Sequence, residues 1–119
     1  MGLWASAFGF ANLASVFMSS AFGYQNTASR GGSSTFGHWN RVNGMYSSAF
    51  GSQYEVTGNF SGAFGVGKVT INASGKEYKY INKGNNSYMI GNYNKIASGS
   101  NNNFILGNNV SIGSGINNS

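Results

Sequence analysis

A hydrophobic residue recurs every 14 positions through the first half of the chain, and each time a glycine follows it. The repeated unit is Ser-Ala-Phe-Gly at Ser6, Ser20 and Ser48, with close variants beginning at Ser34 and Gly62. Self-similarity at a fixed period is typical of repeat architectures in which each repeat forms one coil of a stack. This hydrophobic column, with its aliphatic continuation, comprises Phe8, Phe22, Phe36, Phe50, Phe64, Ile90 and Leu106.

A repeat of 14 residues holds two short strands and two tight turns, but it is too short for a helical repeat. A second column lies six residues after each phenylalanine and consists of Ala14, Ala28, Val42, Val56 and Thr70. Because strand residues alternate faces, we expect this column inside and its often charged neighbours outside. We therefore predict that the phenylalanine column packs against it within a narrow roll. Each buried phenyl ring would contribute about 1.5–3 kcal/mol.

The residue before each phenylalanine is small and uncharged, and these residues are Ala7, Ala21, Thr35, Ala49 and Ala63. On the expectation that phenylalanine points inward, this strip lies on the outer face of the same strand. Small residues let neighbouring subunits approach closely. We therefore predict a three-fold interface along the strip.

The rhythm breaks after Phe64, because the next equivalent position is Ile90, 26 residues later. About 12 residues are inserted, and the segment around Ala73–Lys76 is typical of a hairpin turn. We expect this hairpin to project from the roll. The period then becomes 16 residues. The prediction is a single all-β domain of seven coils, with coils over 1–70, an inserted hairpin at about 71–86, and coils over 87–119.

Asparagine lies four residues after the first three phenylalanines, at Asn12, Asn26 and Asn40. Stacked asparagines in parallel coils can form hydrogen bonds along the stack, as they do in cross-β structures. We therefore expect an asparagine ladder along one turn.

Composition supports a packed repeat domain. The 119 residues include 19 glycines and no proline, 40% are hydrophobic and only 8% are charged. The regular aromatic column argues against disorder. The net charge of +5 is scattered and does not form a dense stripe, so it does not indicate a nucleic-acid partner and suits attraction to acidic surfaces. Without cysteine the chain has no disulfide or thiolate metal site.

Targeting features are also few in the sequence. It contains no apolar run of about 18 residues and no recognisable signal peptide at its start. Both ends fall within repeats, so we expect the chain to be a piece of a longer protein.

Motifs that carry chemistry are weak. Gly62–Lys68 approaches a phosphate-binding loop, but Val69 stands where a hydroxyl is needed. His38 is the only histidine, Glu55 would be its acidic partner, and no nucleophile motif accompanies them. The Asn-X-Ser matches are expected from composition alone. We predict no enzymatic activity, cofactor or metal.

Aromatic residues gather at both predicted turns. We expect them either to pack between coils and subunits or to form an exposed strip that binds a partner. The inserted hairpin adds lysines, which would mainly steer association. The candidate receptor-binding residues are Trp39, Tyr46, His38, Phe60, Lys76, Lys79 and Lys83.

The Ser-Ala-Phe-Gly units, with Tyr-Met-Ile-Gly and Phe-Ile-Leu-Gly near Ile90 and Leu106, resemble the repeats of YadA-like heads of trimeric autotransporter adhesins. The stretches Ile96–Asn103 and Leu106–Gly113 are especially similar. This chain departs from the pattern by using phenylalanine in five coils and by the long insertion.

The resemblance implies a left-handed parallel β-roll that forms a homotrimer. It also implies display on the surface of a Gram-negative bacterium, with an outer-membrane anchor elsewhere in the protein, and a role in virulence. Heads of this family bind matrix proteins such as collagen, fibronectin and laminin. Some members bind carcinoembryonic-antigen-related cell adhesion molecules.

A structural or surface-binding trimeric solenoid is the alternative expectation, such as a segment of a phage fibre, which also trimerises, or an ice-binding roll. Ice binding favours a regular threonine ladder, and the outward columns here are irregular in threonine.

Overall fold

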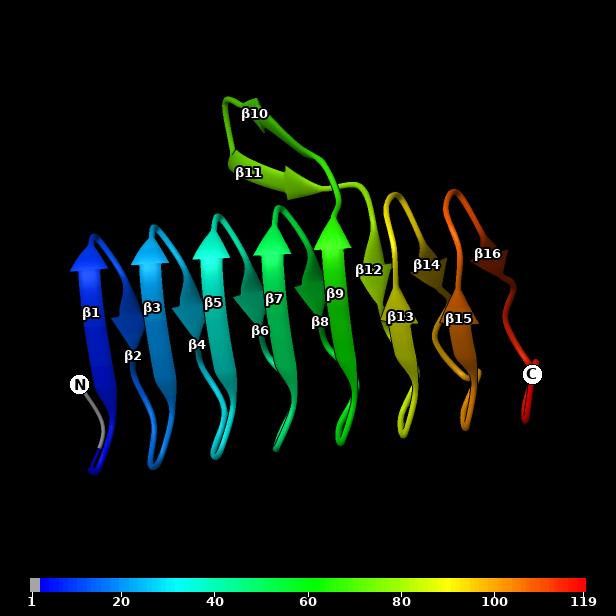
Figure 1. Ribbon diagram of the computed structural model, residues 1–119, viewed down its shortest axis with the longest axis horizontal. Helices are drawn as coiled ribbons and strands as arrows, with labels where there is room; N and C mark the ends of the chain where they lie inside the picture. Colours follow the sequence, from blue (N-terminus) through cyan, green and yellow to red (C-terminus); the bar gives the residue numbers. More distant parts are fainter. Residues whose placement is uncertain (1–2) are drawn as a thin grey trace.

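The computed structural model describes residues 3–119, and its elements are strands joined by turns (Figure 1). Seven longer strands form one parallel sheet: β1 (Ser6–Phe10), β3 (Ser20–Tyr24), β5 (Ser34–His38), β7 (Ser48–Ser52), β9 (Gly62–Val66), β13 (Tyr88–Ile90) and β15 (Phe104–Leu106). Seven two-residue strands form the second parallel sheet: β2 (Leu13–Ala14), β4 (Thr27–Ala28), β6 (Arg41–Val42), β8 (Glu55–Val56), β12 (Ile81–Asn82), β14 (Lys95–Ile96) and β16 (Ser111–Ile112). The predicted all-β repeat fold is confirmed.

The strands pair in the register of the repeat, so that Phe22 lies beside Phe36 and Phe36 beside Phe50. After β16 the chain begins a further turn, in which the carbonyl of Ser119 accepts a hydrogen bond from Phe104 at 2.7 Å. The longest dimension is 36 Å, close to the roughly 34 Å expected for seven coils at about 4.8 Å each. Each repeat is therefore one coil of a β-solenoid.

The small residues that precede each phenylalanine fill the roll, and the phenylalanines point outward. Ala21, Ala49 and Ala63 are fully buried, whereas Phe8 is 74% and Phe50 38% exposed. The prediction that the phenylalanine column forms the core is therefore wrong, because the opposite face of each long strand points inward. The residues wrongly placed inside are Phe8, Phe22, Phe36, Phe50, Phe64, Ile90 and Leu106.

The predicted trimer interface fails for the same reason. Ala21, Thr35, Ala49 and Ala63 expose no surface, so a neighbouring subunit cannot contact them. Ala7 is exposed because it lies on β1, the end strand of its sheet.

The narrow interior explains this orientation. The second inner column was predicted correctly, since Ala14, Ala28, Val42 and Val56 are buried. Facing them across the roll there is room for alanine or threonine, and a phenyl ring would push the two sheets apart. Alternation along each long strand then places phenylalanine on the opposite face.

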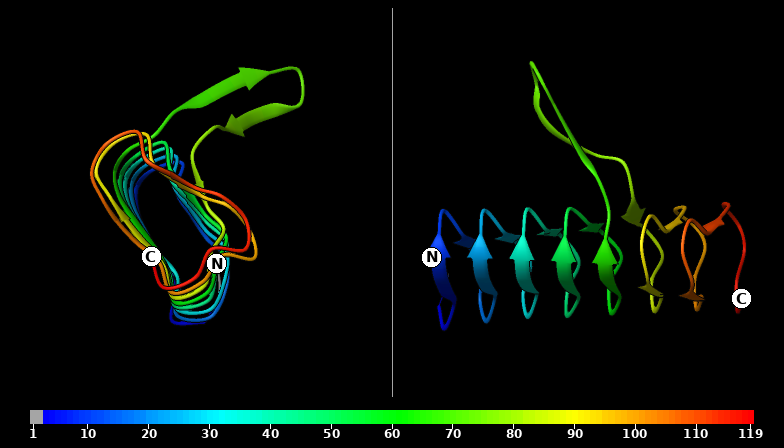
Figure 2. Two further views of the ribbon diagram at one scale, coloured as in Figure 1. Left: turned by 90° about the vertical axis from the view of Figure 1, so that its right-hand side faces the viewer. Right: turned by 45° about the horizontal axis from the view of Figure 1, so that its top comes forward.

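The last coils are wider, as the view along the stack shows (Figure 2). Their inner positions accordingly hold larger side chains: Met89 and Ile96 are fully buried and Ile105 is 3% exposed. Ile90 and Leu106, which were predicted inside, are 37% and 77% exposed. The two additional residues per coil therefore widen the interior so that it holds larger core residues. The same face of each long strand still points inward.

The predicted asparagine ladder is present at the turn between the two sheets. The Asn12 Oδ1 atom accepts from the Asn26 backbone N–H at 3.0 Å, and Asn26 accepts from Asn40 in the same way. The side-chain amide of Asn26 donates to the carbonyls of Phe22 and Gly37, so a fully buried amide is satisfied. A second ladder, of serine hydroxyls, occupies the opposite turn, where Ser61 N–H donates to Ser47 and Ser87 N–H to Ser61.

The insertion is an antiparallel hairpin of β10 (Val69–Asn72) and β11 (Gly75–Tyr78), with its turn where it was predicted. It begins and ends earlier than the predicted 71–86, because β12 has already rejoined the short sheet beside β8. Asn82 is buried at the inner position predicted for Thr70, which is exposed in the hairpin instead. The hairpin leaves the roll and leans back over the coils of β5 to β9 (Figure 1).

Candidate functional site

The outer face of the long-strand sheet, here called the aromatic face, carries a continuous stack of phenyl rings. The centroids of Phe22 and Phe36 are 4.9 Å apart, those of Phe36 and Phe50 4.7 Å, and those of Phe50 and Phe64 5.2 Å. The ring planes differ by 5°, 5° and 11° along the series. Parallel β-pairing sets this spacing, since the same residue recurs in each strand.

A second stack runs beside the first on the same face. Phe10 stacks on Tyr24 at 5.4 Å, and Tyr24 stacks on His38 at 5.3 Å. None of the seven positive and two negative residues lies on the seven long strands. The aromatic face is therefore uncharged and partly exposed. These properties are typical of a surface that another molecule covers.

The predicted turn aromatics separate into two places. Tyr46 and Phe60 lie together at the turn that leads into the long strands, with ring centroids 5.7 Å apart and exposures of 54% and 52%. Their φ angles are +51° and +54°, a region that bulky residues seldom adopt. This conformation holds both rings on the outside of the turn. We call the pair the turn patch.

Trp39 lies at the other turn, beneath the hairpin. The Lys76 ammonium is 4.7 Å from the centre of the Trp39 ring, and the Tyr78 hydroxyl donates to the Trp39 carbonyl at 2.7 Å. Trp39 is thereby half-buried, and its indole N–H has no hydrogen-bond partner among the described residues. It is an anchor for the hairpin, which makes it less available to a receptor than Tyr46 or Phe60.

Tyr78, which sequence reasoning did not single out, is the residue that docks the hairpin. It is 7% exposed, and the Arg41 guanidinium carbon lies 4.6 Å from the centre of its ring. Arg41 also forms an ion pair with Glu55 on the next coil. Burial raises the pKa of Tyr78 to about 12, with Arg41 opposing that rise and Glu55 adding to it. The tyrosine therefore stays protonated and able to donate.

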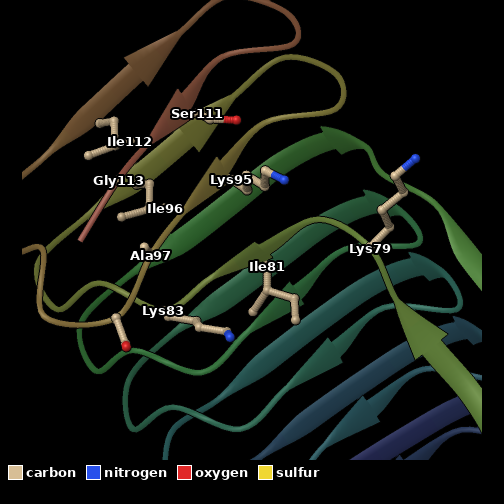
Figure 3. A pocket seen from close by; sticks show the side chains of 10 residues that line it. Lys79, Ile81, Lys83, Lys95, Ile96, Ala97, Ser111, Ile112 and Gly113 are labelled. Carbon is tan, nitrogen blue, oxygen red and sulfur yellow. The ribbon is translucent and has the colours of Figure 1, made fainter.

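The hairpin lysines do not act together. Lys76 is held over Trp39 and also donates to the Gln25 side chain at 3.2 Å. Burial, and secondly the charge of Arg41, lower the pKa of Lys76. Lys79 and Lys83 lie elsewhere, at a pocket of about 420 Å³ that Lys95 also lines (Figure 3). Lys95 was not among the predicted binding residues, although it occupies the same outward-facing position of the short strand as Arg41 and Glu55 do in their coils.

The structure does not bring His38 and Glu55 together. The His38 Nδ1 atom lies 3.4 Å from the Ser52 hydroxyl, and Glu55 is paired with Arg41 instead of the histidine. Residues 3–119 hold no group of three or more histidine, cysteine or acidic side chains placed to bind a metal. They also include no helix that is long and apolar enough to cross a membrane.

Comparisons of the chain with protein-family models, curated proteins and solved structures found no significant match. The aromatic face, the turn patch and the pocket are the candidate functional surfaces among residues 3–119.

Proposed function

We propose that this chain is the head of a trimeric bacterial surface adhesin, which assembles through its aromatic face and presents its turns to a host ligand. The observation that carries the proposal is the uncharged stack of outward phenyl rings on the long-strand sheet. The resemblance of its repeats to YadA-like heads supports the same function, together with display at the cell surface through an anchor elsewhere in the protein.

The partner at the aromatic face is another copy of the same chain. Parallel sheets are normally covered on both faces, and the roll covers only one face of this sheet. A second copy offers a stack with the same strand spacing, so that rings can interleave over the full length of both chains. The exposed Phe50 and Leu106 then lose their contact with water. The three-fold symmetry and the left-handed coil are the parts of the proposal that come from the resemblance.

Assembly through this face leaves the turn patch free for a ligand. Tyr46 and Phe60 lie at the turns instead of on the sheet, and more than half of each side chain is exposed. Rigid aromatic side chains supply large contact areas at a low entropic cost, and they dominate many protein interfaces. Host receptors, including cell adhesion molecules of the carcinoembryonic-antigen group, or matrix proteins such as collagen, fibronectin and laminin are the partners proposed for this patch.

Light scattering tests the assembly. The parent protein is expected to have the mass of three 12.5 kDa chains, and a Phe36→Glu/Phe50→Glu variant that of one chain with an unchanged β-sheet signal. The matched control is Tyr46→Glu/Phe60→Glu, which changes two exposed aromatic residues outside the aromatic face and should remain trimeric. A monomeric parent, or trimeric Phe36/Phe50 variants, would contradict the proposed interface.

Attachment to cells and to surfaces coated with matrix proteins tests the adhesive function. Tyr46→Ala/Phe60→Ala should remain trimeric and lose attachment. Ile71→Ala removes an apolar side chain that is 63% exposed on the hairpin, and it should attach like the parent. Equal attachment by all three proteins would contradict a role for the turn patch.

A structural segment of a trimeric fibre is the second candidate, since the aromatic face suits self-assembly in either case. A trimer that attaches to no host cell or matrix protein would favour it over the adhesin.

A further inference from the structure

The pocket on the outer side of the short-strand sheet lies away from both the aromatic face and the turn patch. Its walls come from β12, β14 and β16 and from the chain that returns from the hairpin (Figure 3). Its volume of about 420 Å³ falls within the range of small-ligand sites. Because the aromatic face belongs to the other sheet, a trimer formed there leaves this pocket open.

Three of the seven basic residues of the chain meet at this pocket: Lys79, Lys83 and Lys95. No carboxylate neutralises them, because the one ion pair within residues 3–119 joins Arg41 to Glu55 and the other acid, Glu77, accepts from Asn72. Like charges gathered without a counter-charge create a positive potential that favours an anion.

The three lysines are not equivalent. The Lys83 and Lys95 side chains extend over the pocket, whereas the Lys79 ammonium points away at its edge (Figure 3). The Lys79 ammonium also lies 5.8 Å from the centre of the Tyr80 ring. Lys83 and Lys95 therefore line the pocket from neighbouring coils and are the lysines placed to attract an anionic group there, while Lys79 adds attraction at longer range.

The rest of the lining suits a sugar ring. Ile81 lies between the lysines and offers an apolar surface to ring C–H groups (Figure 3). Ser98 and Ser111 line the same pocket and provide hydroxyls that both donate and accept hydrogen bonds. No aromatic side chain lines it, so it lacks the stacking surface that single-stranded nucleic acids need.

We propose that this pocket binds an acidic sugar, with its carboxylate or sulfate group between Lys83 and Lys95 and its ring against Ile81. Such sugars end or line many cell-surface glycans. The inference goes beyond the proposed assembly and turn-patch binding and depends on neither of them.

Titration calorimetry of the whole chain with sialyllactose, which carries a carboxylate, and with a sulfated heparin tetrasaccharide tests the site. Uncharged lactose is the ligand control. At least one acidic sugar should bind at least tenfold more tightly than lactose, and the stronger of the two identifies the anionic group.

Lys83→Gln/Lys95→Gln should weaken this binding at least tenfold, while Lys83→Arg/Lys95→Arg should keep most of it. Both lysines are exposed, so the variants should fold like the parent.

The matched control is Arg30→Gln/Lys68→Gln, which lowers the net charge by the same amount at exposed positions away from the pocket. It should bind like the parent. An equal loss in this control would assign the effect to net charge and overturn the site. Acidic sugars no better than lactose would also overturn it, as would binding only to vesicles containing phosphatidylglycerol, which would indicate a membrane surface instead.

Discussion

The hydroxyl of Tyr54 donates a hydrogen bond to the carbonyl of Gly91 at 2.9 Å, across 37 residues of sequence. The same oxygen accepts from the Asn94 backbone N–H at 3.0 Å. Tyr54 occupies the asparagine position of the fourth coil, and the next coil carries the hairpin in place of a ladder asparagine. A long side chain that ends in a hydroxyl therefore bridges the interruption and carries the polar ladder to Asn94.

Removing this bridge should destabilise the stack. Tyr54→Phe leaves the Gly91 carbonyl and the Asn94 N–H without their partner, and Tyr54 is fully buried. The free energy of unfolding of the Tyr54→Phe variant, measured in urea, should be about 1–3 kcal/mol lower than that of the parent. Tyr46→Phe removes a hydroxyl from an exposed ring and should leave the value unchanged. Equal stability of the two variants would contradict the bridging role.

The inward phase of the alanine column gives a second prediction. Ala49→Leu adds three carbons to a fully buried position, and overpacking should lower the free energy of unfolding by about 1–3 kcal/mol. Ser48→Leu places the same side chain on the outer face one residue earlier. In thermal unfolding, Ser48→Leu should melt close to the parent and Ala49→Leu at a lower temperature. A lower melting temperature for Ser48→Leu than for Ala49→Leu would indicate that phenylalanine points inward.

Gly51 tests how closely the coils approach. Its φ is +122°, and a Cβ atom there would lie 1.9 Å from the Gly65 carbonyl oxygen of the next coil. Gly51→Ala should therefore cost more than about 3 kcal/mol, among the severe single substitutions. Gly99 also has a positive φ, +79°, but no atom lies within 4 Å of its Cβ position. Gly99→Ala should cost only about 1–2 kcal/mol of backbone strain. Similar losses in urea unfolding would show that strain, and not the contact, sets the effect.

The buried Tyr78 predicts a loss of stability at alkaline pH. The ordinary pKa of tyrosine is 10.0 and burial raises that of Tyr78 to about 12, so the unfolded chain loses this proton first as pH rises. The stabilising contribution of Tyr78 is complete below pH 10 and declines between about pH 10 and 12.

Thermal unfolding at several pH values between 9 and about 12 measures this effect. Tyr78→Phe lacks the titrating group and should show a smaller decline than the parent. Burial also raises the pKa of Tyr54, and that contribution is common to both proteins. Parallel declines would contradict the assignment to Tyr78.

The repeat, the two strands per coil and the asparagine ladder follow from the sequence alone, because each arises from a local pattern at a fixed spacing. Phe22, Phe36 and Phe50 recur at the same position, so parallel pairing brings them side by side whichever face they occupy. The interruption after Phe64 likewise predicted the hairpin. Its boundaries were predicted too late in the chain, because Thr70 was assigned to the inner position that Asn82 fills in the structure.

The tertiary structure decided which face of the long strands lies inside. Hydrophobicity favours a buried phenylalanine, but the distance between the two sheets depends on both walls of the roll, and Ala28 and Val42 face a space that admits only small residues. The docking of Tyr78 on Trp39 and the gathering of Lys79, Lys83 and Lys95 around one pocket involve separate coils, so no spacing in the sequence indicates them. Local periodicity determines where a coil begins and ends, whereas the width of its interior and the contacts across coils depend on how the whole stack packs.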